Sequence, residues 1–167
     1  MKKYSAGRLL VYLGLLTALE IVLSRFASIN TFNLKIGFGF VPIVAAAIMF
    51  GSISAAVVAG LGDFVGAVAF PVGPYFFGFT LSAAICGIIR GVCLYKKRSI
   101  IRSLIAAFVC QMIIGLFLNT FWISVLYGTA FWANFYVRLP QCGALFAVEA
   151  VVSYVLQTPL IKLRGVL

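Results

Sequence analysis

Few residues in this sequence have side chains that can do chemistry, and they are spread thinly through long apolar stretches. The chain has three acidic residues and no histidine. Asp63 lies inside one apolar stretch, and Arg25 and Arg138 lie near the ends of two others. Arginine donates paired hydrogen bonds to a carboxylate, while an aspartate or an asparagine binds the polar edge of a heterocycle. These residue types favour ligand binding over catalysis.

Aromatic side chains accompany these polar residues. Asn119 and Trp122 in "LNTFW" are three residues apart and therefore share one helix face. Tyr75, Phe76 and Phe77 come from the loop "GPYFFGF", and such rings stack on flat heteroaromatic ligands. The same residues are also typical of an interhelical hydrogen bond by the asparagine and of an aromatic belt at a membrane surface.

Each ionisable residue has a structural alternative, because a charge inside a membrane is costly. Asp63 could form an ion pair with a neighbouring helix, and Arg25 or Arg138 could extend to the interface. Glu20 and Glu149 lie deeper in apolar stretches. We expect these two to pair between helices or to meet a partner protein rather than to hold a ligand.

Sequence motifs for catalysis and for metal binding are absent. The chain has no GxxxxGK[ST] phosphate loop, no HExxH pair and no nucleophile elbow. The four cysteines, Cys86, Cys93, Cys110 and Cys142, form no CxxC pair and are interpreted as small packing residues. We therefore expect no enzyme activity, no cofactor and no metal, so that any ATP hydrolysis must come from another chain.

The composition predicts an all-α integral membrane protein. Hydrophobic residues make up 64% of the chain and charged residues 10%, whereas a soluble domain has roughly 25% charged residues. Helices satisfy their own backbone groups in a lipid bilayer. A length of 167 residues allows six transmembrane helices in a single domain, residues 1–167. The expected spans are residues 9–27, 36–50, 53–70, a fourth that ends near 95, 100–126 and 133–160, and the second must tilt or be partly buried by protein.

The net charge of +10 would indicate nucleic acid binding in a soluble chain, but in a membrane protein it predicts orientation. Three basic residues, Arg25, Lys35 and Arg138, fall on one face of the membrane. Nine fall on the other face: Lys2, Lys3, Arg8, Lys96, Lys97, Arg98, Arg102, Lys162 and Arg164. Positive residues are retained on the cytoplasmic face. We therefore expect both termini in the cytoplasm, an even number of spans, a lipid bilayer as surroundings and no nucleic acid partner.

Three segments, "LKIGFGFVPIVAAAIMFG", "AGLGDFVGAVAFPVGPYFFGFTLSA" and "LLTALEIVLSR", resemble the S components of ECF-type vitamin transporters, most closely the folate-specific ones. "LNTFWISVLYG" and "FYVRLPQ" fit the folate branch. Two positions depart from the family pattern. Phe77 stands where a proline is expected before Gly-Phe-Thr, and Gly14 replaces the usual alanine of the AxxxA pattern in the first helix.

The resemblance implies an S-component-like bundle in the bacterial cell membrane that captures folate or a related vitamin from outside, with the loop after the first span over the site. It also implies partners, namely a membrane coupling subunit and two cytoplasmic ATPases. Gly14 and Ala18 would contact the coupling subunit, although packing within the chain is an alternative use of small residues four apart. The expected binding residues are Arg25, Lys35, Asp63, Tyr75, Phe77, Asn119, Trp122 and Arg138.

Other functions remain open from the sequence. An S component for thiamine or riboflavin is the nearest alternative, although cationic thiamine would gain less from the outer arginines. A self-sufficient small channel or an assembly scaffold is another. A small membrane enzyme would need paired acids, a histidine or an activated nucleophile, and the three acids of this chain are scattered.

Overall fold

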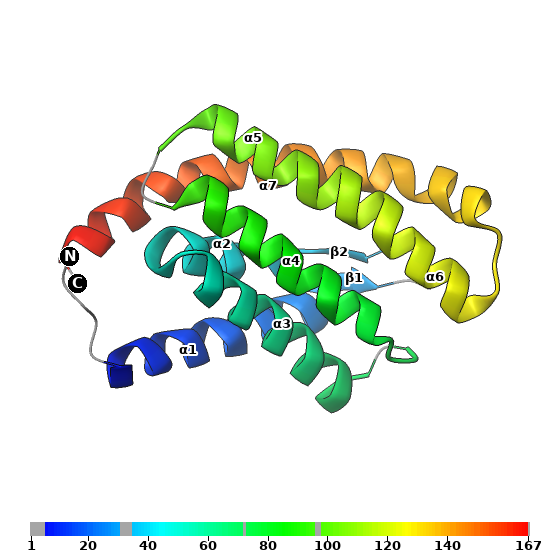
Figure 1. The fold of residues 1–167 in the computed structure, drawn as a ribbon, viewed down its shortest axis with the longest axis horizontal. Coiled ribbons are helices and arrows are strands. Elements are labelled where there is room, and N and C mark those ends of the chain that lie inside the picture. The colour runs from blue at the N-terminus through cyan, green and yellow to red at the C-terminus, as the bar shows by residue number, and fades with distance from the viewer. Residues whose placement is uncertain (1–5, 31–34, 72, 96–97, 167) are drawn as a thin grey trace.

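The computed structural model is a bundle of helices with one short hairpin (Figure 1). It describes residues 6–30, 35–71, 73–95 and 98–166. Within these ranges, five helices are long and apolar enough to cross a membrane, and an 11-residue helix is a shorter sixth. The elements are α1 (Ala6–Arg25), β1 (Ser28–Asn30), β2 (Lys35–Gly37), α2 (Phe40–Phe50), α3 (Ser52–Ala69), α4 (Phe77–Leu94), α5 (Ile100–Phe108), the π-helix η1 (Val109–Leu118), α6 (Asn119–Tyr127) and α7 (Phe131–Val166).

This architecture confirms the predicted all-α membrane bundle, with one addition. The connection after the first helix contains two antiparallel three-residue strands, in which Ser28 lies opposite Gly37. Glycine is needed at this place, because a Cβ at Gly37 would lie 2.5 Å from the Cβ of Ser28. The hairpin is anchored to α1, since the Ser28 hydroxyl donates to the Ser24 carbonyl at 2.6 Å.

The connections divide between two ends of the bundle (Figure 1). The start of α1, the α2–α3 turn, the α4–α5 connection and the end of α7 lie at one end, here called the inner end. The α3–α4 and α6–α7 connections lie at the opposite, outer end. The segments at the inner end carry Arg8, Arg98, Arg102 and Lys162. The arrangement thus keeps these basic residues at one end, as the charge pattern predicts.

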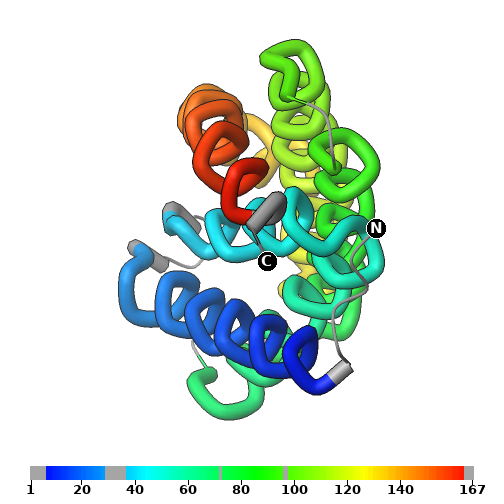
Figure 2. Tube along the Cα trace, turned by 90° about the vertical axis from the view of Figure 1, so that its left-hand side faces the viewer, coloured from blue at the N-terminus to red at the C-terminus, as the bar shows by residue number. Residues whose placement is uncertain are grey.

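The short helix α2 is the centre of the bundle. It contacts α1, α3, α4 and α7, and Figure 2 shows it between α1 and α7 in a view along the bundle. Seven of its 11 residues are buried: Phe40, Pro42, Ile43, Val44, Ala46, Ala47 and Ile48. Protein therefore surrounds the helix that is too short to span a bilayer by itself. This confirms the prediction that the second segment is partly buried by protein.

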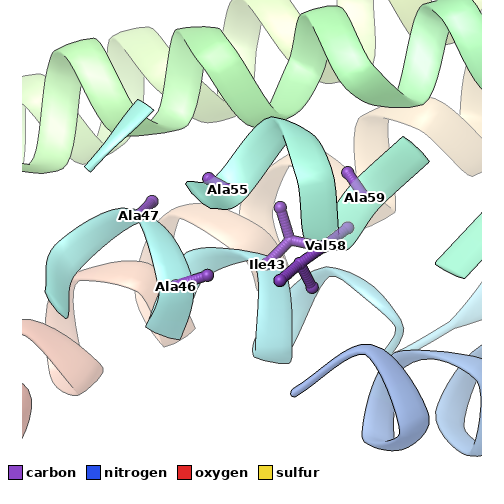
Figure 3. Packing of buried hydrophobic residues seen from close by; sticks show 6 residues of the cluster. All are labelled: Ile43, Ala46, Ala47, Ala55, Val58 and Ala59. Atoms are coloured by element: carbon purple, nitrogen blue, oxygen red, sulfur yellow. The ribbon is translucent and has the colours of Figure 1, made fainter. Parts of the chain in front are cut away.

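Small residues bring α2, α3 and α4 close together. Figure 3 shows the cluster formed between α2 and α3 by Ile43, Ala46, Ala47, Ala55, Val58 and Ala59. Gly51 joins these two helices with φ of 94°, a conformation that glycine adopts without strain. On α4, a Cβ at Gly87 would lie 2.5 Å from the carbonyl oxygen of Ala55. Close approach of helix backbones thus depends on a missing side chain.

We predict that Gly87→Ala destabilises the protein, because the added methyl group meets backbone that cannot rotate away. The expected loss is about 1–3 kcal/mol, as for other overpacked cores. Gly143→Ala is the matched control, since a Cβ there would meet nothing within 4 Å. Thermal unfolding of both variants in detergent measures the difference. Equal midpoints would contradict the close α3–α4 contact.

Candidate ligand-binding site

A cavity of about 750 Å³ lies among α1, α2, α3, α4, η1, α6 and α7. The lining residues of α4 run from Phe79 to Arg90, a distance of about 16 Å along a helix axis. Gly73, Pro74 and Tyr127 line it near the outer connections. The volume lies within the range of about 300–1,000 Å³ usual for small-molecule sites. The cavity therefore reaches from the outer loops deep into the bundle.

A chain of polar contacts joins four segments at the outer part of this cavity. Arg25 Nη2 donates to the main-chain oxygen of Asp63 at 3.3 Å and lies 3.8 Å from its carboxylate. Thr80 Oγ1 donates to Asp63 Oδ2 at 2.8 Å. Because this uses the only proton of the Thr80 hydroxyl, the Tyr75 hydroxyl at 3.0 Å is the donor in their contact. Asp63 therefore takes part in an interhelical ion pair and also lines the cavity.

Arg25 has one buried donor that its interaction with Asp63 does not use. Its Nε is buried and has no hydrogen-bond partner among the described residues. Space for the guanidinium comes from α3, since a Cβ at Gly66 would lie 2.9 Å from that Nε. Arg25 thus points into the bundle and does not extend to the interface.

Arg138 is a buried cation without a carboxylate partner in the described part of the chain. Its side chain is on α7, 8% exposed, and lines the cavity. Nη2 donates to the Gly115 carbonyl at 3.2 Å, and Nε has no hydrogen-bond partner among the described residues. Burying an unpaired charge costs on the order of several kcal/mol, and a bound opposite charge offsets this cost. This arrangement favours an anionic ligand.

The end of the cavity furthest from the outer connections, here called the floor, holds a second ion pair. Arg90 Nε donates to Glu149 Oε1 at 2.7 Å, and the two residues are 5% and 1% exposed. Gln111 Nε2 donates to Glu149 Oε2 at 2.8 Å. The expected pairing of Glu149 between helices is confirmed. Arg90 was not predicted as a cavity residue, because it lies at neither membrane face. The sequence signal that could have found it is a single arginine inside the apolar run "ICGIIRGVCL".

The aromatic residues form a wall beside the outer polar chain. Phe76 lines the cavity, and its ring centre lies 5.4 Å from that of Trp122. Trp122 is outside the lining residues, and its Nε1 donates to Ser82 Oγ at 3.1 Å. A Cβ at Gly78 would lie 2.5 Å from the Phe76 ring and 2.7 Å from the Trp122 ring. Trp122 therefore supports the wall from behind.

The eight predicted binding residues differ in where the structure places them. Five of the eight line the cavity: Arg25, Asp63, Tyr75, Asn119 and Arg138. Asn119 also has a buried Oδ1 with no hydrogen-bond partner in the described part of the chain. Trp122 supports the wall, whereas Phe77 is 66% exposed and outside the lining, and its neighbour Phe76 takes the expected place. Lys35 lies in β2, and its side chain is outside the described part of the chain.

Several further lining residues were not expected from the sequence as ligand contacts. They are Glu20, Ser24, Phe79, Ser82, Arg90, Gln111 and Gln141. Polar residues in apolar helices, such as Gln111 in "VCQMIIGL", are the available signal. Cys86 and Cys110 also line the cavity, and each thiol lies against the backbone carbonyl of the other residue, at 4.0 and 3.7 Å.

The exposed side of α1 carries the two predicted coupling residues. Gly14 and Ala18 are exposed, and a Cβ at Gly14 would meet nothing within 4 Å. Leu10, Val11 and Leu15 nearby are also exposed, at 66–71%. The alternative of packing within the chain is therefore not supported for Gly14.

Comparisons with known proteins place this geometry among transporters. The model of the family described as "ECF transporter, substrate-specific component" matches residues 8–157. A folate transporter, FolT, of Clostridium novyi (strain NT) is 39% identical over 155 residues, which cover 92% of this chain and 88% of that protein. The FolT of Leuconostoc mesenteroides is 31% identical over 89% of this chain and 84% of its own length. A crystal structure of FolT bound with folic acid superimposes with a TM-score of 0.85 at 32% identity, and covers 90% of this chain and 92% of that one.

We predict that Arg90→Met destabilises the bundle by about 3–5 kcal/mol, because it leaves the Glu149 carboxylate buried without its partner charge. The double variant Arg90→Met/Glu149→Leu should recover most of this loss, since neither charge remains. Thermal unfolding of the three proteins in detergent, without ligand, tests the pair. A double variant no more stable than Arg90→Met would contradict the importance of charge pairing at this place.

Proposed function

Because this chain belongs to the family of ECF transporter substrate-specific components, we propose that it binds folate outside the cell and delivers it inward as part of an ATP-driven importer. The observation that carries the proposal is the buried Arg138, which lines the cavity without a carboxylate partner among the described residues. Folate supplies carboxylates from its glutamate tail. The likeness to folate transporters supports the same ligand.

The rest of the cavity is suited to the other parts of folate. The rings of Tyr75 and Phe76 offer faces for a flat pteridine or benzoyl group. Asn119 Oδ1 is a buried acceptor with no partner in the described part of the chain, and Arg25 Nε is a similar donor. Such groups gain hydrogen bonds when a polar ligand enters, which removes a desolvation cost of about 1–3 kcal/mol each.

Another vitamin is the main alternative ligand. Thiamine is a cation, so Arg138 would repel it, and riboflavin has a flat ring system but no carboxylate. A binding assay with a vitamin panel separates these ligands. Failure of folate and of reduced folates to bind below micromolar concentration would exclude the proposed ligand.

Energy for uptake would come from partner proteins. The sequence has no phosphate-binding loop, and a coupling subunit with two cytoplasmic ATPases would supply the hydrolysis. The exposed small residues of α1, Gly14 and Ala18, allow a partner helix to come close. The single domain of residues 1–167 would lie in the bacterial cell membrane with its inner end in the cytoplasm. Folate flux into liposomes that contain this chain alone would favour a self-sufficient channel instead.

Loss of either cavity arginine should weaken folate binding. We expect Arg25→Ala or Arg138→Ala to reduce the binding free energy by roughly 1.5–3 kcal/mol, the value of a hydrogen bond to a charged group. Arg8→Ala, an exposed arginine at the inner end, is the control and should bind as the wild type does. Isothermal titration in detergent gives all three affinities. Unchanged binding by both cavity variants would rule out the arginines as carboxylate contacts.

The α1 surface can be tested separately from binding. We expect Ala18→Leu to leave folate affinity unchanged and to impair ATP-driven uptake, because the larger side chain blocks close approach of a partner helix. Ala147→Leu, at an exposed position on α7, is the matched control. Uptake into cells or proteoliposomes with the complete transporter measures the effect. Normal uptake by Ala18→Leu would show that this surface is not the coupling contact.

A further inference from the structure

Gln111 on η1 has an amide whose orientation is set by its neighbours. Its Nε2 lies 2.8 Å from Glu149 Oε2, while Arg90 Nε donates to the other oxygen, Oε1, at 2.7 Å. Both carboxylate oxygens therefore act as acceptors. Only the NH2 group of Gln111 can donate to Glu149, so the carbonyl oxygen Oε1 must point away from it.

The Gln111 carbonyl oxygen lies on the cavity side of η1. A Cβ at Gly115, one turn further out, would be 3.3 Å from Gln111 Oε1, and both residues line the cavity. Because Gly115 has no side chain, nothing from that position covers the oxygen. Among the described residues, no side chain donates to it. Gln111 thus presents a hydrogen-bond acceptor in a fixed direction.

The charge balance at the floor indicates what this acceptor binds. Arg90 and Glu149 form an ion pair, so they add no net charge at the floor. A ligand carboxylate gains more electrostatic binding energy at Arg138, whose charge has no carboxylate partner in the described part of the chain. Beside the floor lie Cys86 and Cys110, which are small and weakly polar. The floor is therefore suited to an uncharged heterocycle edge that carries an N–H donor.

We propose that Gln111 determines ligand specificity by accepting a hydrogen bond from the exocyclic amino group of a bound heterocycle, and that Glu149 and Arg90 are positioning residues that hold its carbonyl toward the cavity. That this heterocycle is the pteridine ring of folate rests on the proposed function. Glu149 and Arg90 fix the direction of the acceptor, and Gln111 makes the contact.

The first experiment pairs one variant with one ligand change. Gln111→Met keeps the length of the side chain and removes the acceptor, and a folate analogue without the 2-amino group removes the donor. Isothermal titration of the full chain in detergent should show that folate binds about tenfold less tightly to Gln111→Met than to the wild type, as for one lost hydrogen bond. The analogue should bind both proteins equally. Gln157→Met, a buried glutamine outside the cavity lining, is the control and should change neither affinity.

The second experiment tests the positioning role. A glutamine at position 149 can donate to Gln111 as well as accept from it, so Glu149→Gln no longer fixes the direction of the Gln111 amide. We expect folate affinity to fall with little change for the analogue, and Gln111→Met/Glu149→Gln to bind folate as Gln111→Met does. Additive losses, or equal losses for both ligands, would overturn the positioning role.

The outcomes separate this inference from the proposed function. A wild-type protein that does not bind folate refutes the proposed function. A wild-type protein that binds folate, with Gln111→Met either unchanged or weakened equally toward folate and the analogue, refutes only the role of Gln111. If Glu149→Gln does not fold, the Gln111→Met comparison decides by itself, because it alters no charged residue.

Discussion

Charged side chains inside a membrane bundle must find partners, because the surrounding lipid offers neither water nor counterions. The described part of this chain meets that constraint in two places with ion pairs. Arg25 pairs with Asp63 near the outer connections, and Arg90 pairs with Glu149 at the floor of the cavity. Each pair joins two helices that are far apart in the sequence. The ion pairs therefore hold the walls of the cavity as well as satisfying the charges.

Arg138 stands apart from these pairs. It contacts a backbone carbonyl and faces the cavity, but the described residues give it no carboxylate. In a protein with three acidic residues, such a cation costs folding free energy until an anion binds. If the anion is the ligand, binding removes this free-energy cost and the affinity for the ligand rises. This physical link connects the bundle to its function as a substrate-binding subunit.

Much of the fold could be predicted because hydrophobicity and charge act over whole segments. Apolar runs located the helices, and basic clusters grouped the segments that now lie at the inner end. The π-helix η1 was not predicted, since a change of helix type leaves no clear periodic signal in a run as apolar as "VCQMIIGLFL". The hairpin was also missed, because three-residue strands are too short to show an alternating pattern.

The candidate site was predicted only in part, because the sequence shows which residues are polar or aromatic but not which of them face the cavity. Arg25, Asp63 and Arg138 stand out as rare charges in apolar helices. Within the aromatic loop, however, the sequence does not show whether Phe76 or Phe77 faces inward, because that depends on where α4 begins. Arg90 is not evident from the distribution of charges at the helix ends, because it lies inside an apolar helix and its partner Glu149 is 59 residues away.

We propose that the cavity binds folate through the carboxylates of the folate glutamate tail. This binding mode can be tested by titration of the wild-type protein with folate and with a derivative in which both carboxylates are converted to neutral amides. We predict that folate binds below micromolar concentration and that the amide derivative binds at least about tenfold more weakly, since it forms no charge-assisted hydrogen bond. Equal affinity for the two ligands, or no binding of folate, would contradict it.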